Sequence, residues 1–255
     1  MEKIDFDAIK NDLCKIGQAI AKAVGPDIRL YRATHELETY NNIRILRGDY
    51  INTNLKAMVD GMELHTFKRS SWDGRLLIDR RNYLTYSICT KQTLESIPKA
   101  KNRHIPHYLQ TILHIENADV KPMYEQMLLP GMQAEIMSFD EEEYRDDYMQ
   151  VMGEDITFDD RYHHLVITYE TKQGEITYIS AKLLDPNCEL SQEYSMMDLL
   201  KPDYIDLSVD VAEKPAAKDA RNLVGVKRSL VEKKGKVQTQ EPLVSAKREE
   251  GAQQE

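Results

Sequence analysis

The sequence predicts an α+β fold: a single domain over residues 1–211 with two small antiparallel β-meanders packed with four to five helices, then a disordered charged tail over residues 212–255. Three observations support this prediction. Apolar residues recur every three or four positions in some segments, they alternate with polar residues in two separate blocks, and they become scarce beyond Val211.

Two helices are expected near the N-terminus. The first ends at Gly25-Pro26, because proline disfavours continuation of a helix. The second covers Arg47–Val59 and ends at Asp60-Gly61, where the glycine suits a left-handed cap. The apolar stripe of the first helix consists of Phe6, Ile9, Leu13, Ile16, Ile20 and Val24.

The first meander follows directly. Segments Met62–Lys68, Arg75–Ile78 and Tyr83–Cys89 show the period of strands. Asp73-Gly74 and residues 79–82 are the expected turns between them. Alternation directs Tyr86 into the core and leaves Tyr83 and Trp72 toward solvent.

Helical periodicity then returns. A short helix is expected over Gln92–Ile97, and the next helix takes Pro106 in its first turn. Met132–Met137 is read as a strand, and Ser138 is the expected N-cap of an acidic helix whose carboxylates suit the helix dipole.

The second meander is predicted from a hairpin around Lys172-Gln173-Gly174. On its first strand, Leu165, Ile167 and Tyr169 share one face, and the residues between them share the other. Because both sets are apolar or β-branched, we expect both faces of this strand to be covered.

Bulk properties narrow the class of protein. The net charge is −9, and no apolar run approaches the ~20 residues of a membrane span. The acidic, amphipathic N-terminal segment is unlike a signal peptide, so a cytoplasmic location is expected. Cys14, Cys89 and Cys188 have no metal-binding or disulfide spacing, and no phosphate-binding glycine motif occurs. No cofactor and no metal are predicted.

Charge is distributed unevenly along the chain. Residues 61–110 hold nine Lys and Arg against four acids, whereas residues 138–161 hold ten acids against two arginines. Two interpretations stay open: the segments pair with each other or are solvated, or each faces a partner of opposite charge.

The basic segment is the candidate nucleic-acid surface, with cations for phosphates and aromatic rings for unpaired bases. The alternative is a solvated sheet face. The candidate residues are Lys68, Arg69, Trp72, Arg75, Arg80, Arg81, Arg103 and His107.

The acidic helix is the candidate surface for a basic protein partner. Asp140, Glu143 and Asp147 fall on one side of it at helical spacing. The same three carboxylates could hold Mg²⁺ in a nuclease, although no nuclease motif accompanies them. Histidines do not converge into a metal site, since His163 and His164 point to opposite faces of a strand.

The order of several motifs resembles an uncharacterised bacterial family, a domain of unknown function of low-GC Gram-positive bacteria and their phages and mobile elements. These motifs are ILRGDYINTNL, FKRSSWDGRLLIDRRNYLTYSICT, HYLQTILHIENADV, SFDEEEY, HHLVITYET and AKLLDP, within Ile43–Leu184. The matching positions are Arg69, Trp72, His107, Tyr108 and Leu109, while Cys89-Thr90 stands where a basic residue is expected.

The resemblance implies no activity. It implies a cytosolic accessory protein of a bacterium or mobile element, and a toxin–antitoxin or phage-defence context belongs to the leading functional hypothesis. With the basic segment, it favours a protein that engages single-stranded nucleic acid. The alternatives are a protein–protein interaction module acting through the acidic helix and, third, a metal-dependent nuclease.

Overall fold

A computed structural model describes residues 4–69, 71–100, 103–124, 139–153 and 162–200. The predicted strand at Met132–Met137 and the predicted tail at residues 212–255 lie outside them. The helices are α1 (Lys10–Lys22), α2 (Ile28–Thr34), α3 (Ile43–Met58), α4 (Lys91–Ser96), α5 (Tyr108–Glu116) and α6 (Glu141–Met152). The strands are β1 (Glu63–Arg69), β2 (Trp72–Asp79), β3 (Leu84–Thr90), β4 (His163–Lys172), β5 (Glu175–Leu184) and β6 (Leu190–Ser195).

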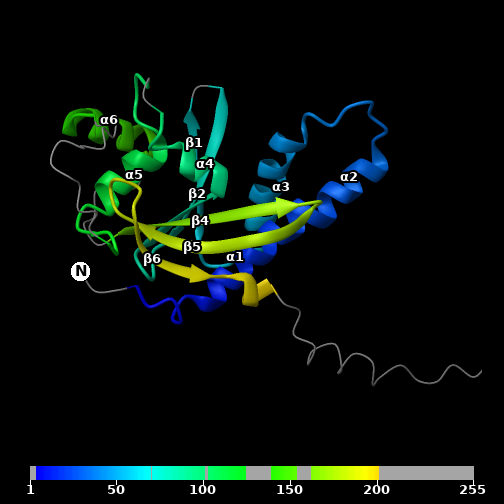
Figure 1. The fold of residues 1–255 in the computed structure, drawn as a ribbon, viewed down its shortest axis with the longest axis horizontal. Helices are drawn as coiled ribbons and strands as arrows, with labels where there is room; N and C mark the ends of the chain where they lie inside the picture. The colour runs from blue at the N-terminus through cyan, green and yellow to red at the C-terminus, as the bar shows by residue number, and fades with distance from the viewer. Residues whose placement is uncertain (1–3, 70, 101–102, 125–138, 154–161, 201–255) are drawn as a thin grey trace, which may run out of the picture. The chain divides into compact units, whose positions relative to one another are not determined.

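The six strands form one mixed sheet in the order β1-β2-β3-β4-β5-β6 (Figure 1). Strands β1–β3 and β4–β6 are the two antiparallel meanders, so the predicted α+β class is confirmed. A parallel pairing of β3 with β4 joins them, with Leu84 opposite His163 and Thr90 opposite Tyr169. Two parallel strands must be joined by a long crossover connection. Here that connection contains α4, α5 and α6.

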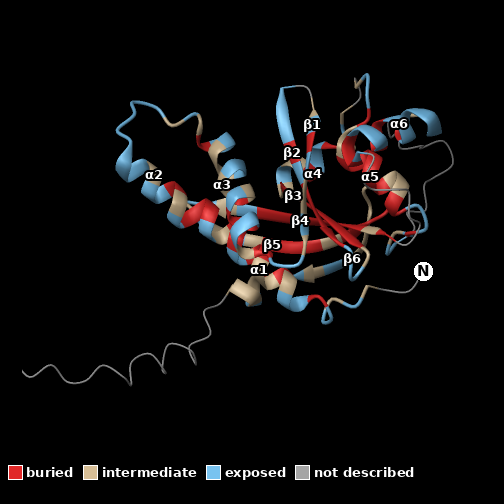
Figure 2. Cartoon of the chain, turned by 180° about the vertical axis from the view of Figure 1, so that it is seen from behind, coloured by how far each residue is buried: buried red, intermediate tan, exposed pale blue. Residues whose placement is uncertain are grey.

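Helices cover both faces of this sheet; its central strands β3 and β4 are largely buried in Figure 2, whereas the edge strands β1 and β6 are mostly exposed or half-buried. On one face, α1 and α3 pack on a cluster that includes Leu77, Tyr86 and Ile167. On the other, α5 and α6 pack on Phe67, Leu76 and Ile78 of the first meander, while α4 and α5 pack on Val166 of β4. Val166 and Ile167 are fully buried on opposite faces, as predicted for this strand.

The first helix continues past Gly25-Pro26, contrary to the prediction. A π-helical turn, Ala23–Asp27, takes Pro26 into the helix and leads into α2. Pro26 has no amide hydrogen, so the turn loses one donor without breaking. Buried Asn54 of α3 donates to the Asp27 carboxylate at 2.7 Å and ties the turn to α3.

The predicted turn at Asp73-Gly74 is also wrong, because both residues lie inside β2. Gly74 pairs with Phe67 of β1, and a Cβ at Gly74 would lie 2.1 Å from the Phe67 ring. This glycine therefore makes room for a ring that crosses the strand. Trp72 is accordingly the first residue of β2 and does not lie in a turn.

Helix starts also differ from the prediction, and α3 begins at Ile43, four residues before the predicted Arg47. His107 caps α5, so Pro106 precedes the helix. Asp140 caps α6 in a reciprocal capping box with Glu143, which replaces the expected cap at Ser138. Among the described residues, no helix combines the length and apolar character that a membrane span requires.

Candidate ligand groove

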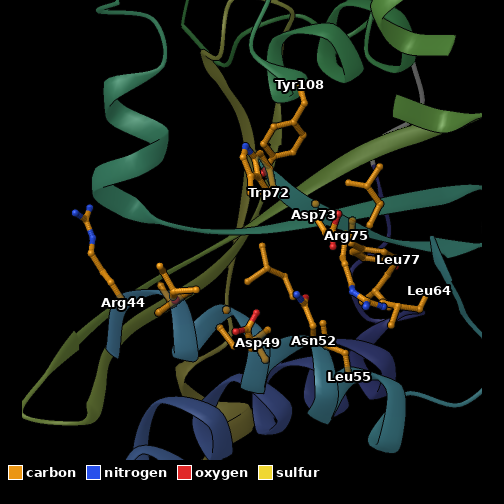
Figure 3. A pocket seen from close by; sticks show the side chains of 18 of the residues that line it. Arg44, Asp49, Asn52, Leu55, Leu64, Trp72, Asp73, Arg75, Leu77 and Tyr108 are labelled. Carbon is orange, nitrogen blue, oxygen red and sulfur yellow. The ribbon is translucent and has the colours of Figure 1, made fainter. Parts of the chain in front are cut away.

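A groove of about 570 Å³ lies between α3 and the strands of the first meander (Figure 3). Its volume falls within the usual range for small-molecule and cofactor sites. One wall is helical and consists of Arg44, Ile45, Gly48, Asp49, Ile51, Asn52 and Leu55. The strands contribute Leu64 from β1, Trp72 to Leu77 from β2, and Tyr86 and Ile88 from β3, with Tyr169 of β4 and Tyr108 of α5 beside them.

Backbone periodicity explains which side chains reach the groove. Arg44, Gly48 and Asn52 are four residues apart, so they line one side of α3 one turn after another. In β2, Asp73 and Arg75 alternate with Gly74, which meets Phe67 on the opposite face. The groove therefore combines charged side chains from a helix and a strand.

Trp72 is an exposed aromatic side chain at this groove. It is 46% exposed, although two neighbouring aromatic rings hold its indole ring in place. Phe67 and Tyr108 make edge contacts with it, at centroid distances of 5.8 Å and 5.7 Å. Figure 3 shows Trp72 directly below Tyr108. Because the two neighbours restrain the indole, it can offer a face to a ligand with little loss of side-chain entropy.

The predicted basic surface divides into three groups. Lys68, Trp72 and Arg75 are exposed, and neither cation has an ion pair among the described residues. Arg80 and Arg81 are exposed but already paired. Arg80 donates two hydrogen bonds to Glu63, at 3.0 Å and 2.8 Å, and Arg81 pairs with Asp12 and Asp79.

The third group is turned inward. Arg69 is mostly buried and pairs with Asp147 of α6, and it also donates to the carbonyl oxygen of Pro106. Arg103 donates to Gln110 at 2.9 Å. The His107 ring caps α5, and burial, together with nearby Arg103 and Arg69, lowers its pKa to about 4. His107 is therefore neutral at pH 7 and cannot serve as a phosphate-binding cation there.

The predicted acidic surface is also divided. Asp140 and Glu143 are exposed and bond to each other's backbone in the cap. Asp147 is buried, where it accepts hydrogen bonds from Arg69 and Thr111, so it cannot take part in an exposed patch. Among the described residues, no group of three His, Cys, Asp or Glu side chains could hold a metal ion.

A buried polar network lies on the sheet face opposite the groove, and sequence reasoning missed it. His164 Nε2 lies 2.8 Å from the Ser87 hydroxyl, and its Nδ1 lies 2.6 Å from the Thr85 hydroxyl. Thr85 donates its proton to Glu116, so the proton between Thr85 and His164 belongs to Nδ1. The Tyr148 hydroxyl donates to the second oxygen of Glu116 at 2.8 Å.

Burial dominates the electrostatics of this network. It raises the pKa of Glu116 to about 7, against the hydrogen bonds from Thr85 and Tyr148, and lowers that of His164 to about 3. All of these side chains are buried and hydrogen-bonded, which is the arrangement that limits the cost of burying polar groups. The network links β3, β4, α5 and α6. The sequence feature that could have indicated this network is the pair of hydroxyl residues Thr85 and Ser87 at alternate positions of a buried strand.

A tyrosine of the groove has an unusual hydroxyl. Tyr86 is only 1% exposed, lines the groove, and its oxygen has no hydrogen-bond partner among the described residues. Burial and the carboxylates of Asp79 and Asp12 raise its pKa, so it stays protonated as a donor. Such a buried donor costs free energy until an acceptor is supplied.

Comparisons with known proteins place the chain in a family. No curated protein matches it, and no solved structure matches it. One family model, described as a family of unknown function, matches residues 3–246, which is nearly the whole chain. The expectation of an uncharacterised family is thereby confirmed, and the chain belongs to the family of unknown function DUF5986.

Proposed function

We propose that this protein binds single-stranded nucleic acid in the groove between α3 and the first meander. The observation that carries the proposal is a single groove lined by the exposed, braced Trp72 and by two exposed arginines, Arg44 and Arg75. An aromatic face that stacks a base, next to cations that contact phosphates, is the usual composition of single-strand sites.

The form of the groove supports an extended ligand. Its helical wall runs from Arg44 to Leu55, which at 1.5 Å per residue is a length of ~16 Å. Strand β2 forms the facing side, with Arg75 exposed on it. A flexible strand can lie along such a groove and place a base on Trp72.

The charges that line the groove favour contact with only one or two phosphates of a bound strand. Asp49 and Asp73 line the groove with the two arginines, so its own lining is close to neutral, and Lys68 of β1 adds one exposed cation nearby. The chain as a whole carries −9. Because distant repulsion is screened within ~8 Å at physiological salt, the local arginines can still hold one or two phosphates. We therefore expect modest affinity and a small salt dependence.

The other two functions receive less support. Asp147 is paired with Arg69 and does not contribute to an acidic surface, so a partner site centred on α6 is less well supported. The three carboxylates of the nuclease hypothesis do not converge, since Asp140 and Glu143 serve the cap and Asp147 is buried. A role as a cytosolic accessory protein of a bacterium or mobile element remains part of this proposal and rests on the resemblance of motifs.

A fluorescence-anisotropy titration with short labelled oligonucleotides at two salt concentrations tests the proposal. Trp72→Ala should cost about 1–3 kcal/mol of binding free energy through lost stacking. Replacing Arg44 and Arg75 together by Gln should reduce the slope of log affinity against log salt by about 1.4, because each phosphate contact on a single strand contributes ~0.7.

Arg80→Gln is the matched control, because Arg80 is an exposed arginine of the same meander that is paired with Glu63 outside the groove. It should leave affinity and salt slope unchanged. Absence of wild-type binding at low salt, or a loss in Arg80→Gln equal to that in the groove variants, would overturn the proposal.

A further inference from the structure

A glycine in the middle of α3 has no explanation in the packing of the domain. Gly48 lies inside this helix, where glycine costs roughly 0.5–1 kcal/mol relative to alanine. Its φ is not in the left-handed region, and a Cβ built on it meets nothing within 4 Å. By contrast, a Cβ on Gly17 of α1 would lie 3.1 Å from Leu200, so close packing accounts for that glycine.

The missing side chain leaves a gap in the helical wall of the groove. Arg44 lies one turn before Gly48 and Asn52 one turn after it, and all three line the groove. Figure 3 shows Arg44 and Asn52 on the helical wall of the groove, with Asp49 between them. A ligand can therefore approach the backbone of α3 more closely at Gly48 than at its neighbours.

We propose that Gly48 and Asn52 form a notch that receives one base of the bound strand; this rests on the proposed binding of single-stranded nucleic acid in the groove. The flat base lies against the backbone at Gly48. The Asn52 amide is half-buried, and its side-chain groups have no hydrogen-bond partner among the described residues. It presents a donor beside an acceptor, which complements N7 and the N6 amino group of an adenine whose N7 edge faces it.

The notch and the Trp72 ring then recognise different features of the bound strand, the edge of a base and the face of a base. Trp72 stacks any base, since every base has a π-face. In the proposed pose the N7 edge of the base faces Asn52, and at that edge adenine alone of the four bases offers an acceptor beside a donor, so the notch adds a preference for adenine; cytosine offers the same pair only at its Watson–Crick edge. Arg44, one turn away, is placed to contact the phosphate next to that base.

Titrations of the full chain with labelled oligo-dA and oligo-dC test this inference. Wild type should prefer oligo-dA. Gly48→Ala should bind oligo-dA about tenfold more weakly, because a methyl group in a filled notch is an overpacking change. Its melting temperature should be equal to or above that of wild type. Asn52→Ala should abolish the preference for oligo-dA, while Thr53→Ala, on the same helix but outside the groove lining, should change nothing.

The outcomes separate the two proposals. If wild type binds both oligonucleotides and Gly48→Ala binds as wild type does, the notch is refuted and the groove stands. If wild type binds oligo-dA and oligo-dC equally, or if Asn52→Ala keeps the preference for oligo-dA, the reading of adenine is refuted. If wild type binds neither oligonucleotide, the proposed function and the notch are refuted together.

Discussion

Substitution of Gly74 by alanine tests how the Trp72 platform is built. A Cβ at Gly74 would lie 2.1 Å from Cζ of Phe67, and 2.5 Å and 2.6 Å from its two Cε atoms. Favourable carbon–carbon contact begins at about 3.5 Å, so the ring must move by more than ~1 Å. Phe67 is 4% exposed and touches Trp72 and Tyr108, so it cannot move without disturbing both.

Forcing extra atoms into a packed core costs about 1–3 kcal/mol. In a domain of this size, each kcal/mol lowers the melting temperature by about 2–4 °C. Gly74→Ala should therefore melt several degrees below wild type in scanning calorimetry, and binding through Trp72 should weaken. Phe67→Leu removes the clashing ring atoms, so Gly74→Ala should cost less in that background, with a coupling of at least ~1 kcal/mol.

Gly48→Ala is the matched control, since the same substitution there meets nothing and should raise the melting temperature. Equal effects at the two glycines would refute the packing argument. So would strictly additive costs in the double mutant of Phe67 and Gly74, because additivity would mean that the methyl group and the ring do not meet.

Two further predictions concern buried polar groups. Asp147→Ala leaves Arg69 mostly buried without its carboxylate and should lower the free energy of unfolding by about 3 kcal/mol in urea titrations; a loss below ~1 kcal/mol would mean that water takes over the pairing. Glu116 has its pKa raised to about 7, so its contribution to stability is present below its ordinary pKa near 4.5 and is lost as pH rises to 7. His164 has its pKa lowered to about 3, so its contribution is present above its ordinary pKa of 6.5 and is lost as pH falls toward 3. Between pH 4.5 and 6.5 the pH dependences of Glu116 and His164 have opposite signs. Glu116→Gln removes one of them, so the free energy of unfolding should rise with pH in this range by an extra ~1.4 kcal/mol per pH unit. An unchanged pH profile would contradict these pKa directions.

The secondary structure could be predicted well because its signals are local. The alternation in Tyr83–Cys89 and Leu165–Tyr169 marks strands, and it placed Tyr86 in the core correctly. Gly74 misled the prediction because glycine signals a turn far more often than room for a neighbouring ring. Nothing local distinguishes these two uses of glycine.

The candidate site was harder to predict because it depends on contacts between distant residues. Arg69 meets Asp147 across 78 positions of the chain, so an apparent surface cation and an apparent surface acid neutralise each other. The groove brings α3 onto the sheet beside β2, and the sequence contains no motif for that meeting. Of the residues predicted for the nucleic-acid surface, Trp72 and Arg75 line the groove, while its helical wall was not foreseen.

The groove is tested most directly by ultraviolet crosslinking of the full chain to a short single-stranded oligonucleotide, followed by mapping of the modified peptides. Binding in the groove predicts adducts on the peptides that contain Trp72 and Tyr108, and their loss in Trp72→Ala without a change in the fold. Efficient crosslinking confined to peptides outside the groove, or no crosslinking at low salt, would contradict it.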